Sequence, residues 1–179
     1  MMAHSDPRIA LIAAAAPLAR ERRFATLTAD EICQRAGVDA GVFTSIFGDL
    51  TGYLVAVQQV FMDRLRDRIV AVTAGVPPGM RRIQLATESY LSGCLDERPL
   101  RGWLLEARMR PPVLTGLRRQ NRTYYMILGA ELERLGWTDG AAAARLYLAM
   151  INAASIVEHR SGVQPALRAA LWHFLEHGA

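Results

Sequence analysis

The sequence has 179 residues, a length typical of one domain or of a small module joined to a larger one. Hydrophobic residues make up 51% and charged residues 21%, which excludes a disordered or low-complexity chain. Two cysteines are too few for a disulfide framework and fit a reducing compartment. The apolar run Ile9–Ala16 is too short to span a membrane and lacks the basic start of a signal peptide. We therefore expect a soluble, cytoplasmic protein without a membrane partner.

The formal net charge is +4, and all 21 basic residues are arginines. Residues 1–50 carry five of these arginines and six acidic residues, a net charge of −1, so the positive excess lies in the rest of the chain. The total charge therefore does not by itself indicate a nucleic-acid-binding surface near the N-terminus.

The sequence predicts an all-α fold of about nine helices, because alanine, leucine and arginine dominate and no stretch alternates as a strand would. The first helix is expected from Asp6 to Arg22, with Ser5 as its N-cap and Pro17 in its interior, where proline breaks or kinks a helix. Glu31 completes a T-x-x-E capping box with Thr28 at the start of a second helix. That helix ends at Gly37, and further helices are expected over about 40–47, 51–72, 83–94, 99–107, 112–135, 139–160 and 165–178.

Two short helices joined at Gly37 have the outline of a helix-turn-helix. The stretch FATLTADEICQRAGVDAGVFTSIFGDLTGYLVAV resembles the N-terminal domain of TetR-family transcriptional regulators, whose pattern includes I-A-x-x-A-G-V-S-x-G-x-L-Y-x-x-F. The resemblance covers about residues 8–57, and the matching positions are Phe24, Thr26, Thr28, Ile32, Ala36, Gly37, Val38, Gly41, Phe43, Phe47 and Leu54.

This resemblance implies a helix-turn-helix DNA-binding domain over residues 1–50 and a ligand-binding and dimerisation domain over residues 51–179. It also implies a homodimer that binds double-stranded operator DNA and is released or modulated by a small hydrophobic effector. The expected DNA-binding residues are those at the two helix starts and on the second helix, together with one arginine: Thr26, Thr28, Arg35, Asp39, Ala40, Gly41, Val42, Thr44 and Ser45.

The sequence departs from the family pattern at positions that would touch DNA. Thr44 replaces a tyrosine, Asp39 replaces a serine on the expected DNA side, and Leu50 replaces a lysine. Residues 40–47 contain no arginine, lysine, asparagine or glutamine that could read base edges. An alternative is therefore a TetR-like ligand-binding or interaction module that has lost specific DNA binding.

The last two helices are apolar on more faces than one fold can cover, which favours an isologous dimer over a buried core helix in a monomer. The expected dimer interface consists of Leu146, Ala149, Ala153, Leu167, Leu171 and Phe174. Soft and aromatic side chains of the middle helices are candidate pocket residues, although such side chains also form ordinary cores. They are Trp103, Met109, Asn121, Tyr124, Tyr125, Tyr147 and Met150.

Catalytic motifs are absent from the sequence, which contains no G-x-S-x-G, P-loop or G-x-G-x-x-G pattern. His173 and His177 lie four residues apart, but the sequence near them offers no third ligand for a metal. We therefore expect a non-enzymatic protein without a metal or cofactor.

Overall fold

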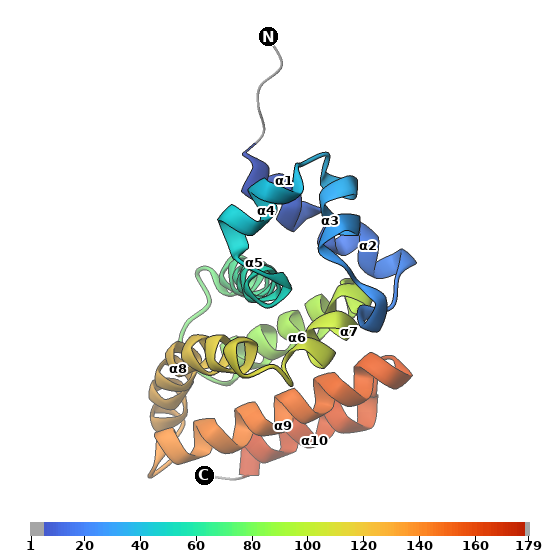
Figure 1. Ribbon diagram of the computed structural model, residues 1–179. Coiled ribbons are helices and arrows are strands. Elements are labelled where there is room, and N and C mark those ends of the chain that lie inside the picture. Colours follow the sequence, from blue (N-terminus) through green and yellow to red (C-terminus); the bar gives the residue numbers. More distant parts are fainter. Residues whose placement is uncertain (1–5, 178–179) are drawn as a thin grey trace. The chain divides into compact units, whose positions relative to one another are not determined.

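A computed structural model describes residues 6–177, and it confirms an all-α fold (Figure 1). No strand occurs in this part of the chain. The elements are α1 (Pro7–Ala13), α2 (Ala15–Glu21), a 3-10 turn η1 (Phe24–Thr26), α3 (Ala29–Ala36), α4 (Ala40–Phe47), α5 (Leu50–Thr73), α6 (Met80–Asp96), α7 (Arg98–Ala107), α8 (Pro111–Arg134), α9 (Gly140–Ser161) and α10 (Pro165–His177).

The expected first helix is divided into α1 and α2 at Ala14. The division follows from Pro17, which has no N–H to donate to the carbonyl four residues earlier and whose ring crowds that carbonyl. The side chain of Asp6 accepts a hydrogen bond from the Arg8 N–H and caps α1, whereas the expected cap, Ser5, lies outside the described residues. When α1 and α2 are counted as one interrupted helix, residues 6–177 contain nine α-helices, which agrees with the expected number.

The described chain divides into two compact units whose bounds differ from the expected boundary at residue 50. The first unit contains residues 6–62 and 97–117, and the second contains residues 63–96 and 118–177. The long helices α5 and α8 each run from one unit into the other, so no linker sequence marks the division.

The core of the first unit joins the N-terminal helices to the first half of α5. The rings of Phe43, Phe47 and Tyr53 form an aromatic cluster with centroids 5.3–5.6 Å apart. Tyr53 is fully buried, and its hydroxyl donates to the Leu11 carbonyl at 3.0 Å, which fastens α5 to α1. This packing fixes α4 relative to α1 and α5.

The core of the second unit is built on α9, which packs against α6 and α10. Tyr147 is fully buried and its hydroxyl lies 3.1 Å from that of Thr87 on α6, while its ring stacks on Phe174 of α10. The backbones of α8 and α9 approach closely at Gly129 and Gly140, where a Cβ added at Gly140 would overlap the Gly129 carbonyl oxygen.

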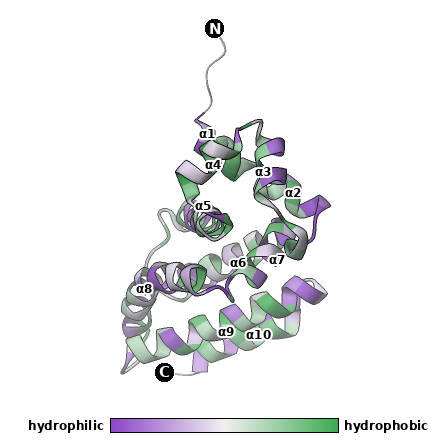
Figure 2. Cartoon of the chain, viewed as in Figure 1, coloured by the Kyte–Doolittle hydropathy of each residue, from purple (hydrophilic) through white to green (hydrophobic). Residues whose placement is uncertain are grey.

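Helix α9 is also long and apolar enough to cross a membrane, as judged by length and composition alone. Its most apolar 18-residue stretch has a mean hydropathy of 1.4, and 39% of that stretch is buried. A core helix with one uncovered apolar face passes the same test. Figure 2 shows hydrophobic residues along both α9 and α10.

Candidate nucleic-acid interface

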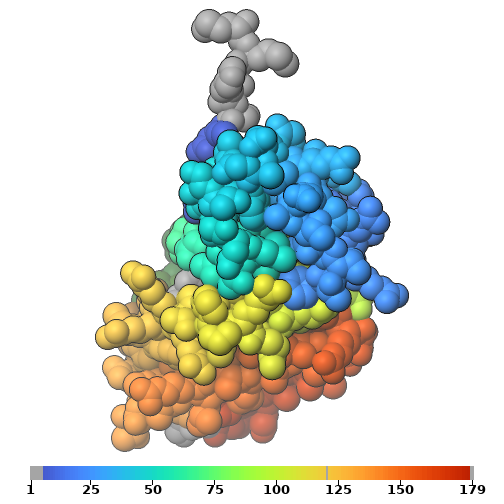
Figure 3. Space-filling view, in the orientation of Figure 1, coloured from blue at the N-terminus to red at the C-terminus, as the bar shows by residue number. Residues whose placement is uncertain are grey.

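The N-terminal helices of the first unit form a helix-turn-helix. Helix α3 ends at Gly37, whose φ of 65° is the left-handed conformation that glycine adopts without strain. The Val38 N–H donates to the Cys33 carbonyl at 3.0 Å and closes the turn. Ile32 and Phe43 are buried beneath the two helices, which leaves the opposite faces of α3 and α4 at the surface (blue to cyan in Figure 3).

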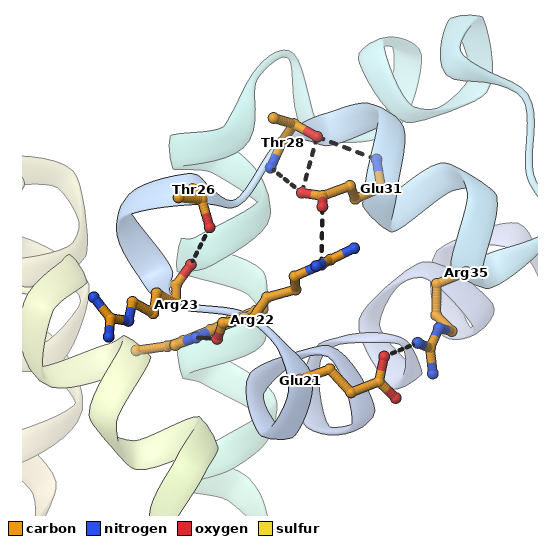
Figure 4. Close-up of polar contacts among 8 residues, drawn as sticks. Glu21, Arg22, Arg23, Thr26, Thr28, Glu31 and Arg35 are labelled. Carbon is orange, nitrogen blue, oxygen red and sulfur yellow. Dashed lines mark hydrogen bonds and ion pairs between the residues drawn. The ribbon is translucent and has the colours of Figure 1, made fainter.

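The start of α3 is held by the expected capping box. The Thr28 hydroxyl accepts a hydrogen bond from the Glu31 N–H at 3.3 Å, and a Glu31 carboxylate oxygen accepts from the Thr28 N–H at 3.1 Å. The other carboxylate oxygen of Glu31 lies 3.1 Å from Nε of Arg22 (Figure 4). Thr28, a candidate DNA contact, therefore already has partners within the protein.

The start of α4 is occupied by Asp39, whose carboxylate accepts a hydrogen bond from the Gly41 N–H at 2.7 Å. Asp39, a candidate DNA contact, is thus the N-cap of the second helix, a role that serine also fills. On the exposed face, the Thr44 hydroxyl donates to the Ala40 carbonyl at 3.2 Å, and Ser45 is exposed. Thr26, also exposed, donates to the Arg23 carbonyl at 3.1 Å. The remaining candidates lie on α4, with Ala40 and Gly41 exposed and Val42 half-buried.

The arginines of this region differ in their surroundings. Arg35 on α3 pairs with Glu21 at the end of α2, and its hydrogen bond holds the pKa of Glu21 below its ordinary value (Figure 4). The two ion pairs flank a hollow of about 350 Å³ between α2 and α3, whose apolar wall includes Leu18. Arg8, Arg20 and Arg23 are also exposed in the first unit.

Helix α7 and the turn that follows it contact the segment before α3 and the start of α5. The indole N–H of Trp103 donates to the Arg22 carbonyl at 3.1 Å, and Arg110 donates to the Thr51 hydroxyl at 3.0 Å. The guanidinium of Arg110 also lies 5.7 Å from the centroid of the Phe24 ring. Trp103, a candidate ligand contact, is thus a buried residue that positions the helix-turn-helix.

The other candidate ligand residues are distributed over both compact units. Met109 is 82% exposed in the first unit, and Tyr147 is a core residue of the second. Burial raises the pKa of Tyr147, whose hydroxyl is engaged by Thr87. The half-buried candidates that remain lie on α8 and α9 in the second unit: Asn121, Tyr124, Tyr125 and Met150.

The candidate dimer residues separate into a surface group and a core group. Leu171 is buried, and Phe174 is half-buried with its ring 5.0 Å from that of Trp137, so these two residues belong to the core of the second unit. The surface group is apolar and lies along α9 and α10: Leu146, Ala149, Ala153 and Leu167. Val157, 42% exposed, extends it along α9.

The rings of His173 and His177 lie 4.3 Å apart on α10. Across residues 6–177, no group of three or more His, Cys, Asp or Glu side chains is placed to hold a metal ion.

Sequence reasoning identified Glu31 as a helix cap, but it missed the ion pair of Glu21 and the capping role of Asp39. Glu21 and Arg35 are fourteen residues apart, a separation that carries no local signal, and Arg22 had no assigned acidic partner. The Asp-x-Gly spacing of residues 39–41 is the one local pattern that could have identified Asp39 as a cap.

No family model and no curated protein matches this sequence. Solved structures of transcriptional regulators do match its fold over nearly the whole chain. A TetR-like regulator from Rhodococcus sp. is 14% identical, with 98% of this chain and 96% of that chain covered and a TM-score of 0.74. A second Rhodococcus regulator is 24% identical, with 96% and 92% covered and a TM-score of 0.75. The fatty acid degradation regulator FadR from Bacillus halodurans is 15% identical, with 96% and 98% covered and a TM-score of 0.75.

The helix-turn-helix and these likenesses together define the fold. The chain has the fold of TetR-family transcriptional regulators.

Proposed function

We propose that this protein is a cytoplasmic transcriptional regulator that binds operator DNA as a homodimer and is modulated by a small hydrophobic effector. The observation that carries the proposal is the helix-turn-helix, in which α3, the Gly37 turn and a partly exposed α4 are held on a buried core. In such a motif the second helix enters the major groove, and a dimer places its two heads about 34 Å apart on the duplex.

The apolar surface of α9 and α10 supports the dimer. Leu146 is 59% exposed, and with Ala149, Ala153 and Val157 it follows spacings of three and four residues along one face of α9. Leu167 on α10 adds to this surface, which we call the α9–α10 face. Burial of the same face on two copies makes an isologous interface.

The second unit is the proposed location of the effector. Its half-buried aromatic residues Tyr124 and Tyr125 on α8 favour an apolar ligand that replaces water at their rings. In the proposed mechanism, the effector binds best to a head spacing that does not match two successive major grooves, and so it shifts the population away from DNA.

A second candidate function is a TetR-like module that senses or docks without reading DNA. It is favoured by the short side chains of α4 and by the acidic partners of Arg22 and Arg35. The measurement that separates the two functions is a fluorescence-anisotropy titration against the DNA upstream of the gene and against random duplex.

For a regulator, we expect the upstream DNA to bind about 1,000-fold or more tightly than random duplex. The slope of log K against log salt is expected to be less steep than the roughly −10 of a strongly electrostatic repressor, because we expect few arginines to contact phosphates.

Thr44→Tyr is expected to strengthen binding by adding a phosphate contact. Asp39→Ser is expected to do so by removing like-charge repulsion while keeping a helix cap. Equal binding of upstream and random DNA at low salt would favour the docking module.

The effector is tested by thermal unfolding in the presence of lipophilic compounds. A ligand that binds only the native protein raises Tm, because it stabilises that state by RT ln(1 + [L]/Kd). We expect Tyr124→Trp to abolish the shift, and we expect a change at Met126, which is exposed on the same helix, to preserve it. A broad set of lipophilic compounds that leaves Tm unchanged would contradict this location.

A further inference from the structure

Four groups in or beside the helix-turn-helix that are chemically suited to bind DNA phosphates are engaged by carboxylates of the same chain. Arg22 pairs with Glu31, and Arg35 pairs with Glu21 (Figure 4). The N–H groups of Thr28 and Gly41, at the starts of α3 and α4, donate to Glu31 and Asp39 at 3.1 and 2.7 Å. Helix N-termini and guanidinium groups are the usual protein partners of phosphate oxygens.

We propose that Glu21, Glu31 and Asp39 attenuate the affinity of the helix-turn-helix for all DNA by occupying groups that would otherwise bind phosphates. The inference rests on the proposed function, in that this region is the one that meets DNA. A phosphate must displace a carboxylate from each group, so each contact exchanges one anion for another.

Glu21 is the carboxylate whose role can be isolated. Glu31 and Asp39 also cap helices, so their replacement would disturb the ends of α3 and α4. Glu21 is the last residue of α2, its side chain is 52% exposed, and glutamine keeps its shape while removing its charge. Its hydrogen bond with Arg35 lowers the pKa of Glu21, so the carboxylate is ionised at neutral pH.

The consequence applies to operator and random DNA alike. Contacts to phosphate carry no sequence information, so releasing Arg35 strengthens binding to every duplex by a similar factor. Each phosphate that is newly neutralised releases a counterion and makes the slope of log K against log salt more negative by about 0.9. The acidic partners therefore keep the protein from being held on DNA of arbitrary sequence.

The test is an anisotropy titration of the full chain with random duplex at several salt concentrations. Glu21→Gln is expected to increase affinity roughly threefold to tenfold at low salt and to steepen the salt slope by about 0.9 per protomer. The matched control is Glu106→Gln, which removes the same charge from an exposed position on α7 in the same compact unit. It is expected to change affinity less than twofold.

A double-mutant cycle assigns the gain to Arg35. Arg35→Gln alone is expected to change affinity little, because Arg35 is already paired with Glu21. The double variant, Glu21→Gln with Arg35→Gln, is expected to have the same affinity as Arg35→Gln alone. The inference is overturned if Glu21→Gln resembles Glu106→Gln, or if its gain persists without Arg35. Far-UV circular dichroism confirms that each variant is folded.

The result that would contradict the proposed function differs from the one that would contradict the attenuating role. If the unmutated protein binds upstream and random DNA equally while the Glu21→Gln cycle behaves as expected, specific reading is excluded and the attenuating role stands. If upstream DNA is selected but Glu21→Gln changes nothing, the regulator stands and the attenuating role is excluded.

Discussion

Glu158 is a fully buried carboxylate in α9, and it makes three hydrogen bonds. Nε and Nη2 of Arg168 each donate to one of its oxygens at 2.8 Å, and the Gln164 N–H donates at 3.0 Å. Burial alone would raise the pKa of Glu158, but the hydrogen bonds from Arg168 and Gln164 outweigh it, and the pKa is lowered from 4.5. The carboxylate therefore joins α9 to α10 in its ionised form.

This lowered pKa has a definite sign in the pH dependence of stability. A carboxyl group with a lower pKa in the folded state stabilises the fold above its unfolded pKa, and the contribution is lost as pH falls below that value. We expect Glu158→Gln to reduce the free energy of unfolding by about 2 kcal/mol at pH 7. The difference from the unmutated protein should shrink as pH is lowered through 4.5. Urea unfolding at a fixed protein concentration measures both quantities, and a difference that is constant with pH would contradict the ionised pair.

At the scale of the element, helix ends were predictable because their signals are local. The capping box of Thr28 and Glu31, the left-handed Gly37 and the cap of α9 at Asp139 each act within a few residues. Pro165 starts α10 as expected, since a proline at the first helical position gives up no hydrogen bond. The division at Ala14 was only half predicted, because Pro17 indicates a disruption without fixing its place.

The faces of the helices were harder to predict than their ends. Periodicity shows that Tyr147, Leu171 and Leu146 are apolar positions of helices, but not which neighbour covers each one. The structure covers the first two with α6, α9 and α10, and it leaves Leu146 exposed. Similarly, the ion pair of Glu21 and Arg35 depends on how α2 meets α3, which no spacing along the chain encodes. The sequence identified the candidate DNA residues, but it did not show which groups of the same chain they contact.

At the scale of the whole molecule, the α9–α10 face is the feature on which both the proposed dimer and the proposed DNA binding depend. Two heads can contact successive major grooves only when the two copies are held together. The five residues that define the face, Leu146, Ala149, Ala153, Val157 and Leu167, are all apolar and exposed, as expected of a surface that a second copy covers. The core beneath it includes Leu171 and Leu175, so surface and core substitutions can be compared in the same two helices.

We expect Leu146→Glu to convert the dimer to a folded monomer, because the twofold interface would bury two unpaired carboxylates at once. Multi-angle light scattering at micromolar concentration measures the mass, and circular dichroism measures the helix content. Val70→Glu is the matched control, since Val70 is 60% exposed on α5 and its change should leave the dimer intact. Leu171→Glu should instead reduce helix content, because it places a charge in the core of the second unit. A monomer in the unmutated protein, or a dimer that persists in Leu146→Glu, would show that the α9–α10 face does not hold two copies together.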